Sequence, residues 1–256
     1  MGRYDGKNVV ITGGSSGLGL AAARYLVDEG ARVMVTGRTS ETLADAAHRL
    51  GDRGVAVRSD ASSLTDIDAL ADRAAAEFGT IDALVVNAGI GSFDAFEDVT
   101  ERTFDDVFAI NAKGPFFTVQ KLAPLLAPGS GVVLTTSIAN RTGWDRLSVY
   151  SASKAALRSM ARTLSRELLP RGIRVNAISP GSIDTGKLEK EAPERAELLK
   201  AQFTASSPMQ RFGHPDEFAP AVAFLAFEAT FVAGIELVVD GGESQLCGRL
   251  DRRTRR

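Results

Sequence analysis

The sequence is poor in the residues that build disulfides and metal centres. Among 256 residues it has one cysteine, Cys247, and two histidines, His48 and His214. A single cysteine excludes a disulfide within the chain and a zinc site made of several thiolates. The two histidines lie far apart and have ordinary neighbours, so a histidine-rich centre is not expected either. We therefore assign no metal site.

Long apolar runs and a strong excess of charge are also missing. The first apolar run, residues 9–11, is too short for the hydrophobic region of a signal peptide, and no run approaches a membrane-spanning length. A net charge of −2 and a pI of about 5.8 argue against a nucleic-acid or anionic-membrane partner. These features predict a soluble, cytoplasmic protein with no nucleic-acid and no membrane partner.

Short apolar runs alternate with helical patterns along the whole chain. The runs predict seven strands, at residues 9–11, 31–35, 55–57, 82–86, 131–135, 173–178 and 235–239. Apolar spacing between them predicts helices at residues 20–27, 39–50, 62–78, 101–110, 112–126 and 149–169. Strands that are apolar throughout and separated by helices indicate a parallel sheet covered on both faces. The length fits one α/β domain, residues 1–256, with a doubly wound sheet.

The first predicted strand runs into a glycine-rich turn that opens a helix. The turn reads Thr12-Gly13-Gly14-Ser15-Ser16-Gly17-Leu18-Gly19. Free N–H groups and the positive end of the helix dipole point at such a turn, and glycine lets a phosphate approach the backbone. A purely structural turn is the alternative. The position after the first strand, with a βαβ pattern behind it, favours a phosphate cradle.

Polar clusters follow several other predicted strands. They are Ser59-Asp60-Ala61, Asn87-Ala88-Gly89 and Thr136-Ser137. In doubly wound sheets, ligands bind outside the carboxyl ends of the strands, near the point where the strand order reverses. We therefore expect the active site at this edge of the sheet.

A tyrosine and a lysine lie one helical turn apart at Tyr150 and Lys154. Tyrosine ordinarily titrates near pH 10, and a neighbouring ammonium favours phenolate, so we expect a lowered pKa and a usable general acid or base. Ser137, thirteen residues upstream at a strand end, can donate to a substrate oxygen. An accidental pair on a solvated helix face is the alternative, which the presence of Ser137 disfavours.

Together these motifs resemble the short-chain dehydrogenase/reductase family from about residue 7 to residue 242. The resemblance implies a Rossmann-type fold and catalytic positions at Asn111, Ser137, Tyr150 and Lys154. Tyr150 would give a proton to a carbonyl oxygen in reduction or remove one in oxidation, and Ser137 would hold that oxygen. Lys154 would lower the pKa of the tyrosine and bind the nicotinamide ribose. Asn111 would hold a water of a proton relay.

The resemblance also implies a dinucleotide site along the strand ends. Its expected residues are Thr12, Gly13, Ser15, Ser16, Gly17, Leu18, Gly19, Arg38, Thr39, Asp60, Ala61, Asn87, Ala88, Gly89, Tyr150, Lys154, Pro180, Gly181, Ile183 and Thr185. An enzyme that prefers NAD usually places a carboxylate at the end of the second strand, and this chain has Gly37 there. Arg38 offers a guanidinium suited to a 2′-phosphate. We expect NADP(H) as cofactor; the alternative is that NAD(H) is also accepted.

The expected reaction interconverts a ketone or aldehyde and a secondary alcohol. We expect a small free carbonyl substrate; the alternatives are a 3-oxoacyl-[acyl-carrier-protein] reductase and a non-catalytic NADP-binding protein of the same fold. Carrier proteins are acidic, and the similar β-ketoacyl reductases meet them with basic residues near the two central helices. Arg171 and Arg174 could provide them on one side, but no Lys or Arg lies between Lys121 and Arg141.

Three further expectations concern the periphery. Residues 187–209 fall where similar proteins carry a lid over the substrate. Phe93, Trp144, Phe203 and Met209 are each equally compatible with a packed core and with a pocket wall. The tail, residues 243–256, ends in arginines and is expected to be disordered at its end. The helices at residues 112–126 and 149–169 carry apolar faces; in similar proteins these helices and the last strand form subunit interfaces, so the resemblance implies a homotetramer.

Overall fold

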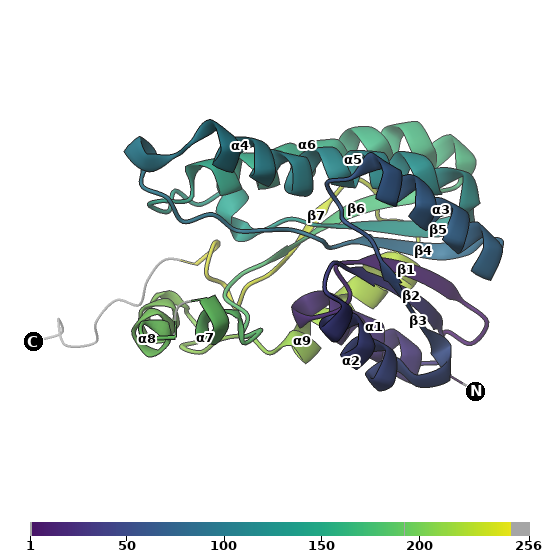
Figure 1. Cartoon of the computed structure of the whole chain (residues 1–256), viewed down its shortest axis with the longest axis horizontal. Coiled ribbons are helices and arrows are strands. Elements are labelled where there is room, and N and C mark those ends of the chain that lie inside the picture. The colour runs from purple at the N-terminus through teal and green to yellow at the C-terminus, as the bar shows by residue number, and fades with distance from the viewer. Residues whose placement is uncertain (1, 192, 247–256) are drawn as a thin grey trace, which may run out of the picture.

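Seven parallel strands form one sheet at the centre of the molecule (Figure 1). The structure is a computed structural model, and it describes residues 2–191 and 193–246. The strands are β1 (Asn8–Thr12), β2 (Arg32–Gly37), β3 (Gly54–Arg58), β4 (Ile81–Val86), β5 (Leu126–Thr135), β6 (Arg174–Pro180) and β7 (Glu236–Val239). Their order is β3-β2-β1-β4-β5-β6-β7, and every neighbouring pair is parallel. The predicted doubly wound sheet is confirmed.

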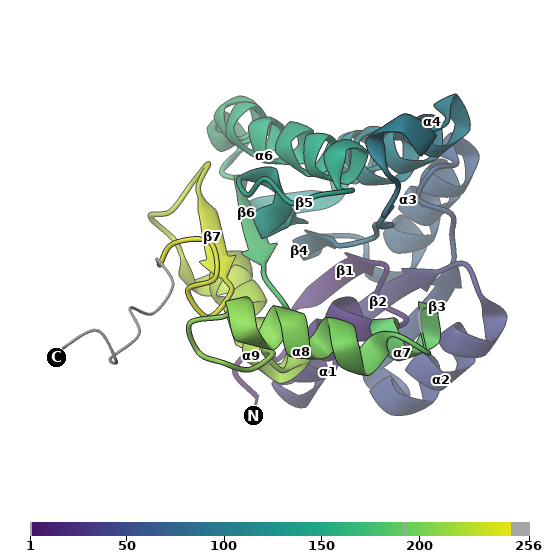
Figure 2. The ribbon, with the colours of Figure 1, turned by 90° about the vertical axis from the view of Figure 1, so that its left-hand side faces the viewer.

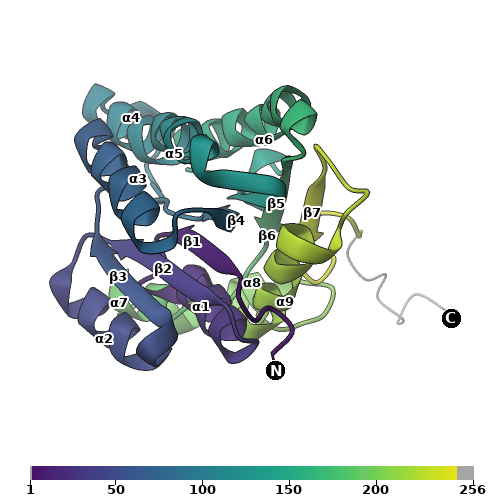
Figure 3. The ribbon, with the colours of Figure 1, turned by 90° about the vertical axis from the view of Figure 1, so that its right-hand side faces the viewer.

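Helices cover both faces of this sheet (Figures 1 and 3). The lower layer in Figure 1 contains α1 (Gly17–Asp28), α2 (Ser40–Leu50) and α9 (Pro215–Ala223). The upper layer contains α3 (Leu64–Phe78), α4 (Glu101–Phe108), α5 (Gly114–Leu122) and α6 (Ser148–Leu168). Val9 and Ile11 pack into the core that contains α1 and α9, and Val10 packs into the opposite core. Because both faces are buried, the central strands have near-continuous apolar runs rather than an alternating pattern.

The expected helices at residues 101–110 and 112–126 are one helical run with an interruption. α4 leads into a π-helical turn at Ala109–Lys113, then α5, then a 3₁₀ turn at Ala123–Leu125. Pro115 has no N–H to donate to the carbonyl of Asn111, four residues earlier, so regular α-helical bonding cannot continue through this point. Turns of this kind occur often at functional sites. Asn111 therefore lies in an irregular turn and not in a regular α-helix.

Two helical segments lie outside the sheet layers, at the end of the molecule in front in Figure 2. They are α7 (Lys187–Glu191) and α8 (Ala196–Ser206), within the expected lid. Their charges are partly paired, because Lys200 binds both Asp184 and Glu189. In the part of the chain that the structure describes, no helix is long and apolar enough to cross a lipid bilayer.

Sequence periodicity did not predict α9, which is short and contains Pro220. A capping box begins this helix: His214 accepts from the backbone N–H of Asp216, and Glu217 accepts from that of His214. Packing then holds the helix, since Phe218 and Val222 are buried against the lower core. Tertiary contact rather than helical propensity accounts for this element.

Candidate active site

Two clefts open at the carboxyl edge of the sheet, on either side of the point where the strand order reverses between β1 and β4. The β2–β3 cleft has a volume of about 200 Å³ and the β4–β6 cleft one of about 380 Å³. Expected site residues that line the first are Gly13, Ser15, Arg38, Thr39, Asp60, Ala61, Ala88 and Gly89. Those that line the second are Gly17, Leu18, Asn87, Gly89, Ser137, Tyr150, Lys154, Pro180, Gly181, Ile183 and Thr185. Gly89 borders both, so the two clefts adjoin.

Ser137, Tyr150 and Lys154 meet in the β4–β6 cleft. Ser137 follows the end of β5, and the other two lie one turn apart near the start of α6. The Ser137 hydroxyl is hydrogen-bonded to the Tyr150 phenol. The Nζ atom of Lys154 donates to the carbonyl of Thr135 at 2.9 Å and lies 5.8 Å from the centroid of the Tyr150 ring. A hydroxyl, a phenol and a buried ammonium therefore surround one space.

The pKa of Tyr150 differs from the expected lowering. Burial raises the pKa of the phenol above its usual value of 10.0, and the hydrogen bond with Ser137 offsets only part of this effect. The expected lowering by Lys154 was wrong for this structure, because the Lys154 ammonium is directed to the Thr135 carbonyl. Burial, together with the charge of Lys187, lowers the pKa of Lys154 to about 8. At neutral pH the phenol is neutral and the amine is mostly protonated.

Asn111 lies behind the cleft rather than on its wall. Its side chain is fully buried, accepts from the N–H of Ile90 at 2.9 Å, and donates to the Ile90 carbonyl and the Ser153 hydroxyl. A side chain at Gly89 would lie 3.1 Å from the Lys154 Nζ atom and 3.2 Å from the Asn111 Oδ1 atom. The glycine therefore permits the close approach of these two polar groups.

The glycine loop has the shape of a cradle that side chains would fill. Gly13 has a φ of +65°, and a Cβ there would lie 2.7 Å from the Cα of Ala88. A Cβ at Gly19 would lie 2.3 Å from the Gly13 carbonyl oxygen. Ser16 is the N-cap of α1, but its side chain makes no capping hydrogen bond to the N–H groups of the first helical turn. This arrangement fits a pyrophosphate at the N-terminus of α1.

The remaining expected residues support the loop from behind. Thr12 accepts from the N–H groups of Asn87 and Ala88 through its hydroxyl, and Asn87 donates to the Gly13 carbonyl. These bonds join the ends of β1 and β4. Four of the expected site residues line neither cleft: Thr12, Ser16, Gly19 and Asn111.

The end of β2 leaves no room for an acidic side chain without rearrangement. A Cβ at Gly37 would lie 2.3 Å from the Ser15 hydroxyl oxygen. Arg38 is exposed and borders the β2–β3 cleft with Asp60. Burial alone would raise the pKa of Asp60, but hydrogen bonds from Ser62 and the charges of Arg38 and Arg58 lower it below 3.8. The cleft thus combines a carboxylate and an exposed guanidinium.

Aromatic rings form the outer wall of the β4–β6 cleft. Trp144 stacks on Phe203 with a centroid distance of 5.1 Å and an interplanar angle of 20°. Phe93 also lines this cleft, whereas Met209 lines a separate groove beside Gly241. The structure therefore makes Trp144, Phe93 and Phe203 pocket residues and not core residues.

Two charged residues near the site were missed by the motif analysis. Lys187 lines the β4–β6 cleft, and Glu236 lies just behind the segment that carries Ser137. A charge within an apolar predicted strand was the available signal for Glu236, since buried charges need partners. Nothing in the local sequence separates Lys187 from the other charges of the lid.

Comparison with known proteins gives consistent matches. A family model described as enoyl-(acyl carrier protein) reductase matches residues 13–244. The chain is 40% identical over 247 residues to oxidoreductase asL5 of Sarocladium schorii, covering 95% of this chain and 98% of that protein. It is 35% identical over 248 residues to the L-rhamnose 1-dehydrogenase (NAD(P)(+)) of Azotobacter vinelandii, with coverages of 92% and 96%.

A solved structure agrees with these relatives. The crystal structure of a dehydrogenase/reductase from Sinorhizobium meliloti 1021 matches with a TM-score of 0.86 at 33% identity, covering 93% of this chain and 95% of that one. Both the sequence matches and the fold extend over nearly the whole chain. The protein belongs to the short-chain dehydrogenase/reductase family and is an NAD(P)-dependent oxidoreductase that acts on CH–OH groups.

Proposed function

We propose that the protein is an NADPH-dependent carbonyl reductase, which also runs in reverse as an alcohol dehydrogenase. The observation that carries this proposal is the convergence of Ser137, Tyr150 and Lys154 on one cleft that adjoins the glycine loop. A neutral phenol is the form that can donate a proton to a carbonyl oxygen, and Tyr150 is neutral at pH 7, although its raised pKa makes it a weaker acid than a free tyrosine. The arrangement of the three groups, rather than the pKa of the phenol, supports reduction.

Each residue of the convergence has a distinct role in the proposal. Tyr150 is the proton donor, and Ser137 holds the carbonyl oxygen by donating to it. Lys154 supplies a buried positive charge close to the developing alkoxide. The side chain of Asn111 holds the backbone of Ile90 and the hydroxyl of Ser153 in place. The backbone carbonyl of Asn111, to which Pro115 cannot donate, is the group that would hold a relay water.

NADP(H) fits the residues around the two clefts. The loop from Gly13 to Gly19 would hold the pyrophosphate, and Asp60 and Arg38 the adenosine end. The nicotinamide end would lie against residues 87–89 and 180–185, with Lys154 beside its ribose. When bound, the cofactor supplies the hydride. Preference for the phosphorylated form is supported by Arg38 and by the absence of a carboxylate at position 37.

The carrier-protein alternative receives support from the description of the matching family model. Against it stands Arg174, one of the two basic residues considered for carrier docking. Arg174 is buried and donates to the carbonyls of Leu225, Ala226 and Ala229, so the expectation that it faces a carrier protein was wrong. Arg171 alone remains on that side, and it donates to the Ala123 carbonyl. We therefore retain a free carbonyl compound as the proposed substrate.

A lid role for residues 187–209 belongs to the same proposal. Leu188 at the start of this segment and Phe203 near its end both border the β4–β6 cleft. Movement of α7 and α8 would therefore change access to Ser137 and Tyr150 and exclude water once substrate is bound.

The direct test is the decay of NADPH absorbance with a panel of ketones, aldehydes and one carrier-protein thioester. Turnover of free carbonyl compounds by the purified chain is the expected result. A kcat/KM for the thioester that exceeds every free ketone by about 100-fold, or more than 2 kcal/mol of preference, would favour the alternative. Tight NADPH binding without turnover of any member would indicate a non-catalytic binding protein.

A further inference from the structure

The wall of the β4–β6 cleft opposite Ser137 is built from rings that come from separate segments. Trp144 belongs to the loop before α6, Phe203 to α8, and Phe212 to the loop before α9. Phe203 stacks on Trp144 and meets Phe212 edge-on, with a centroid distance of 6.2 Å and an angle of 86°. Folding thus assembles a continuous aromatic surface that local sequence does not contain.

Further apolar side chains border the cleft beside these rings. They are Ile138, Leu147 and Leu188, and the charged Lys187 lies among them. Asp184, a charged neighbour, binds Lys200 and the N–H of Gly186 and is thereby neutralised. The hydroxyls of Ser137 and Tyr150 lie together in the same cleft. A ligand that is polar all over would leave its hydroxyls unpaired against the rings, which is costly.

We propose that the substrate is a carbonyl compound that carries a bulky apolar ring, which packs against Trp144 and Phe203 while its carbonyl meets Ser137 and Tyr150. This inference rests on the proposed reductase function. It excludes as preferred substrates both polyhydroxylated sugars and short straight-chain ketones. An alkyl ketone with the same number of carbons buries a similar apolar area, so the ring contact alone, worth about 0.5–1.5 kcal/mol, should lower KM by about 2- to 13-fold.

Trp144 makes the test direct, because it is the single tryptophan of the chain. Its emission reports ligand binding without any turnover. We expect an aryl ketone to change this emission at concentrations at which its alkyl counterpart and a sugar do not. If the aryl ketone binds selectively but no carbonyl compound is reduced, the ring contact at Trp144 stands as a binding site, while the proposed function and the substrate role both fail. Turnover with equal or better KM for the alkyl ketone or the sugar overturns the inference.

A variant pair completes the experiment. Phe203→Leu should raise KM for the aryl ketone about 10-fold and leave that for the alkyl ketone nearly unchanged, because only the ring contact is removed. Phe231→Leu is the matched control, since Phe231 is fully exposed and lines neither cleft. Equal effects of the two substitutions would contradict a ring contact at Phe203.

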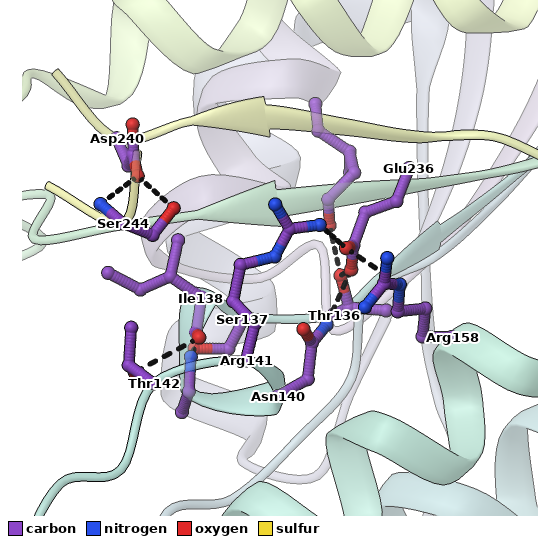
Figure 4. A network of polar contacts seen from close by, with 12 residues as sticks. Thr136, Ser137, Ile138, Asn140, Arg141, Thr142, Arg158, Glu236, Asp240 and Ser244 are labelled. Carbon is purple, nitrogen blue, oxygen red and sulfur yellow. Dashed lines mark hydrogen bonds and ion pairs between the residues drawn. The ribbon is translucent and has the colours of Figure 1, made fainter. Parts of the chain in front are cut away.

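A different observation, the polar network of Figure 4, carries a second inference. The carboxylate of Glu236, on β7, has a side chain that is only 4% exposed. Its Oε1 atom lies 2.7 Å from the Thr136 hydroxyl and also accepts from Asn140 Nδ2. Its Oε2 atom accepts from Arg141 and lies 3.1 Å from the Nε atom of Arg158, on α6.

Three of these four partners flank Ser137 in the sequence. Thr136 precedes it, and Asn140 and Arg141 end the short 3₁₀ turn that follows. Figure 4 shows the carboxylate joining this turn to β7 and α6. We infer that Glu236 is a positioning residue, which fixes the turn and hence the direction of the Ser137 hydroxyl toward Tyr150. This inference also rests on the proposed function.

Glu236→Gln tests this inference. The carboxylate accepts hydrogen bonds at both oxygens, whereas a glutamine amide accepts only at its single oxygen, so one pair of partners loses its acceptor. We expect kcat to fall about 10- to 100-fold with KM for NADPH unchanged, since displacement of a reacting group is costly. Glu236→Asp keeps the charge and should recover part of the loss. The matched control is Glu228→Gln, which removes a carboxylate that binds Tyr4 and Arg3 away from the site.

A double-mutant cycle separates positioning from general destabilisation. If Glu236 acts through Ser137, then Glu236→Gln should change kcat by less than about threefold in a Ser137→Ala background. If the wild type is active, two results would overturn the inference. One is that Glu236→Gln lowers kcat in the Ser137→Ala background as much as it does in the wild type. The other is that the Glu236→Gln and Glu228→Gln variants have equal kcat. A wild type that reduces no carbonyl compound would instead refute the function on which it rests.

Discussion

At the residue scale, the proposed chemistry depends on the Tyr150 hydroxyl. Tyr150→Phe removes the proton donor and leaves the ring that packs beside Lys154. We expect kcat to fall by about 10²- to 10⁴-fold while cofactor binding and the unfolding transition are retained. Single-turnover absorbance measurements check the rate, and fluorescence titration with NADPH checks binding. Retention of more than about a tenth of the activity would refute the assignment.

The pKa of Lys154 gives a prediction about pH. Burial and the charge of Lys187 hold this pKa at about 8, below the usual 10.5. If the protonated amine supports reduction, kcat/KM should fall as the pH rises through about 8. Lys187→Gln removes the repulsion, so the pKa of Lys154 should rise and the alkaline limb should move to higher pH. Lys190→Gln, an exposed lysine on the same helix, is the control; identical profiles for both variants and the wild type would contradict the coupling.

Arg38 determines the expected cofactor preference. A charge-assisted hydrogen bond to a 2′-phosphate is worth about 1.5–3 kcal/mol, which corresponds to roughly 10- to 150-fold discrimination. Arg38→Leu should raise KM for NADPH by this factor and leave NADH nearly unaffected. Arg58→Leu is the comparison variant, because Arg58 acts electrostatically on Asp60 without lining the cleft. A wild-type kcat/KM that favours NADH would show that the end of β2 has been misinterpreted.

At the element scale, Arg174 joins β6 to the end of α9. Its guanidinium donates to three carbonyls in the π-helical turn Phe224–Glu228 and just beyond it. Arg174→Met removes the guanidinium donors of these buried carbonyls, of which that of Ala229 still accepts from the N–H of Val232, and we expect the free energy of unfolding to fall by about 2–3 kcal/mol. Urea unfolding measures this. Arg171→Met removes a single hydrogen bond to the Ala123 carbonyl and should lower the free energy of unfolding by less. Equal decreases for the two variants would contradict a larger contribution from the Arg174 bonds.

At the scale of the whole molecule, two groups among the exposed apolar residues lie on the elements expected to form subunit contacts. Phe104 and Phe116 lie on α4 and α5, and Ile235 and Leu246 lie near β7. Large exposed side chains of this kind indicate subunit contacts. We therefore predict a tetramer with 222 symmetry. Four chains of 27.1 kDa give 4 × 27.1, or about 108 kDa, by light scattering at micromolar concentration.

Two substitutions test the two regions separately. Phe116→Glu and Ile235→Glu should each disrupt one type of contact and leave dimers, because a buried unpaired carboxylate is costly at an interface. A wild-type protein that scatters as a monomer would contradict the prediction.

Much of the fold follows from the sequence alone. The apolar runs predicted all seven strands, because a strand buried on both faces is mostly apolar rather than alternating. The glycine loop and the spacing of Tyr150 and Lys154 depend on local backbone geometry, which neighbouring residues determine. The sequence therefore placed these groups at the carboxyl edge of the sheet before any tertiary contact was known.

Other properties of the site were decided by tertiary structure. Trp144 meets Phe203 and Glu236 meets Arg141 only because loops distant in sequence fold over the same strand ends. The pKa of Tyr150 and the burial of Arg174 likewise depend on how completely other segments exclude water from them. Local pattern determines which groups are available to the site, whereas long-range packing determines their neighbours and their solvation, and hence their charge.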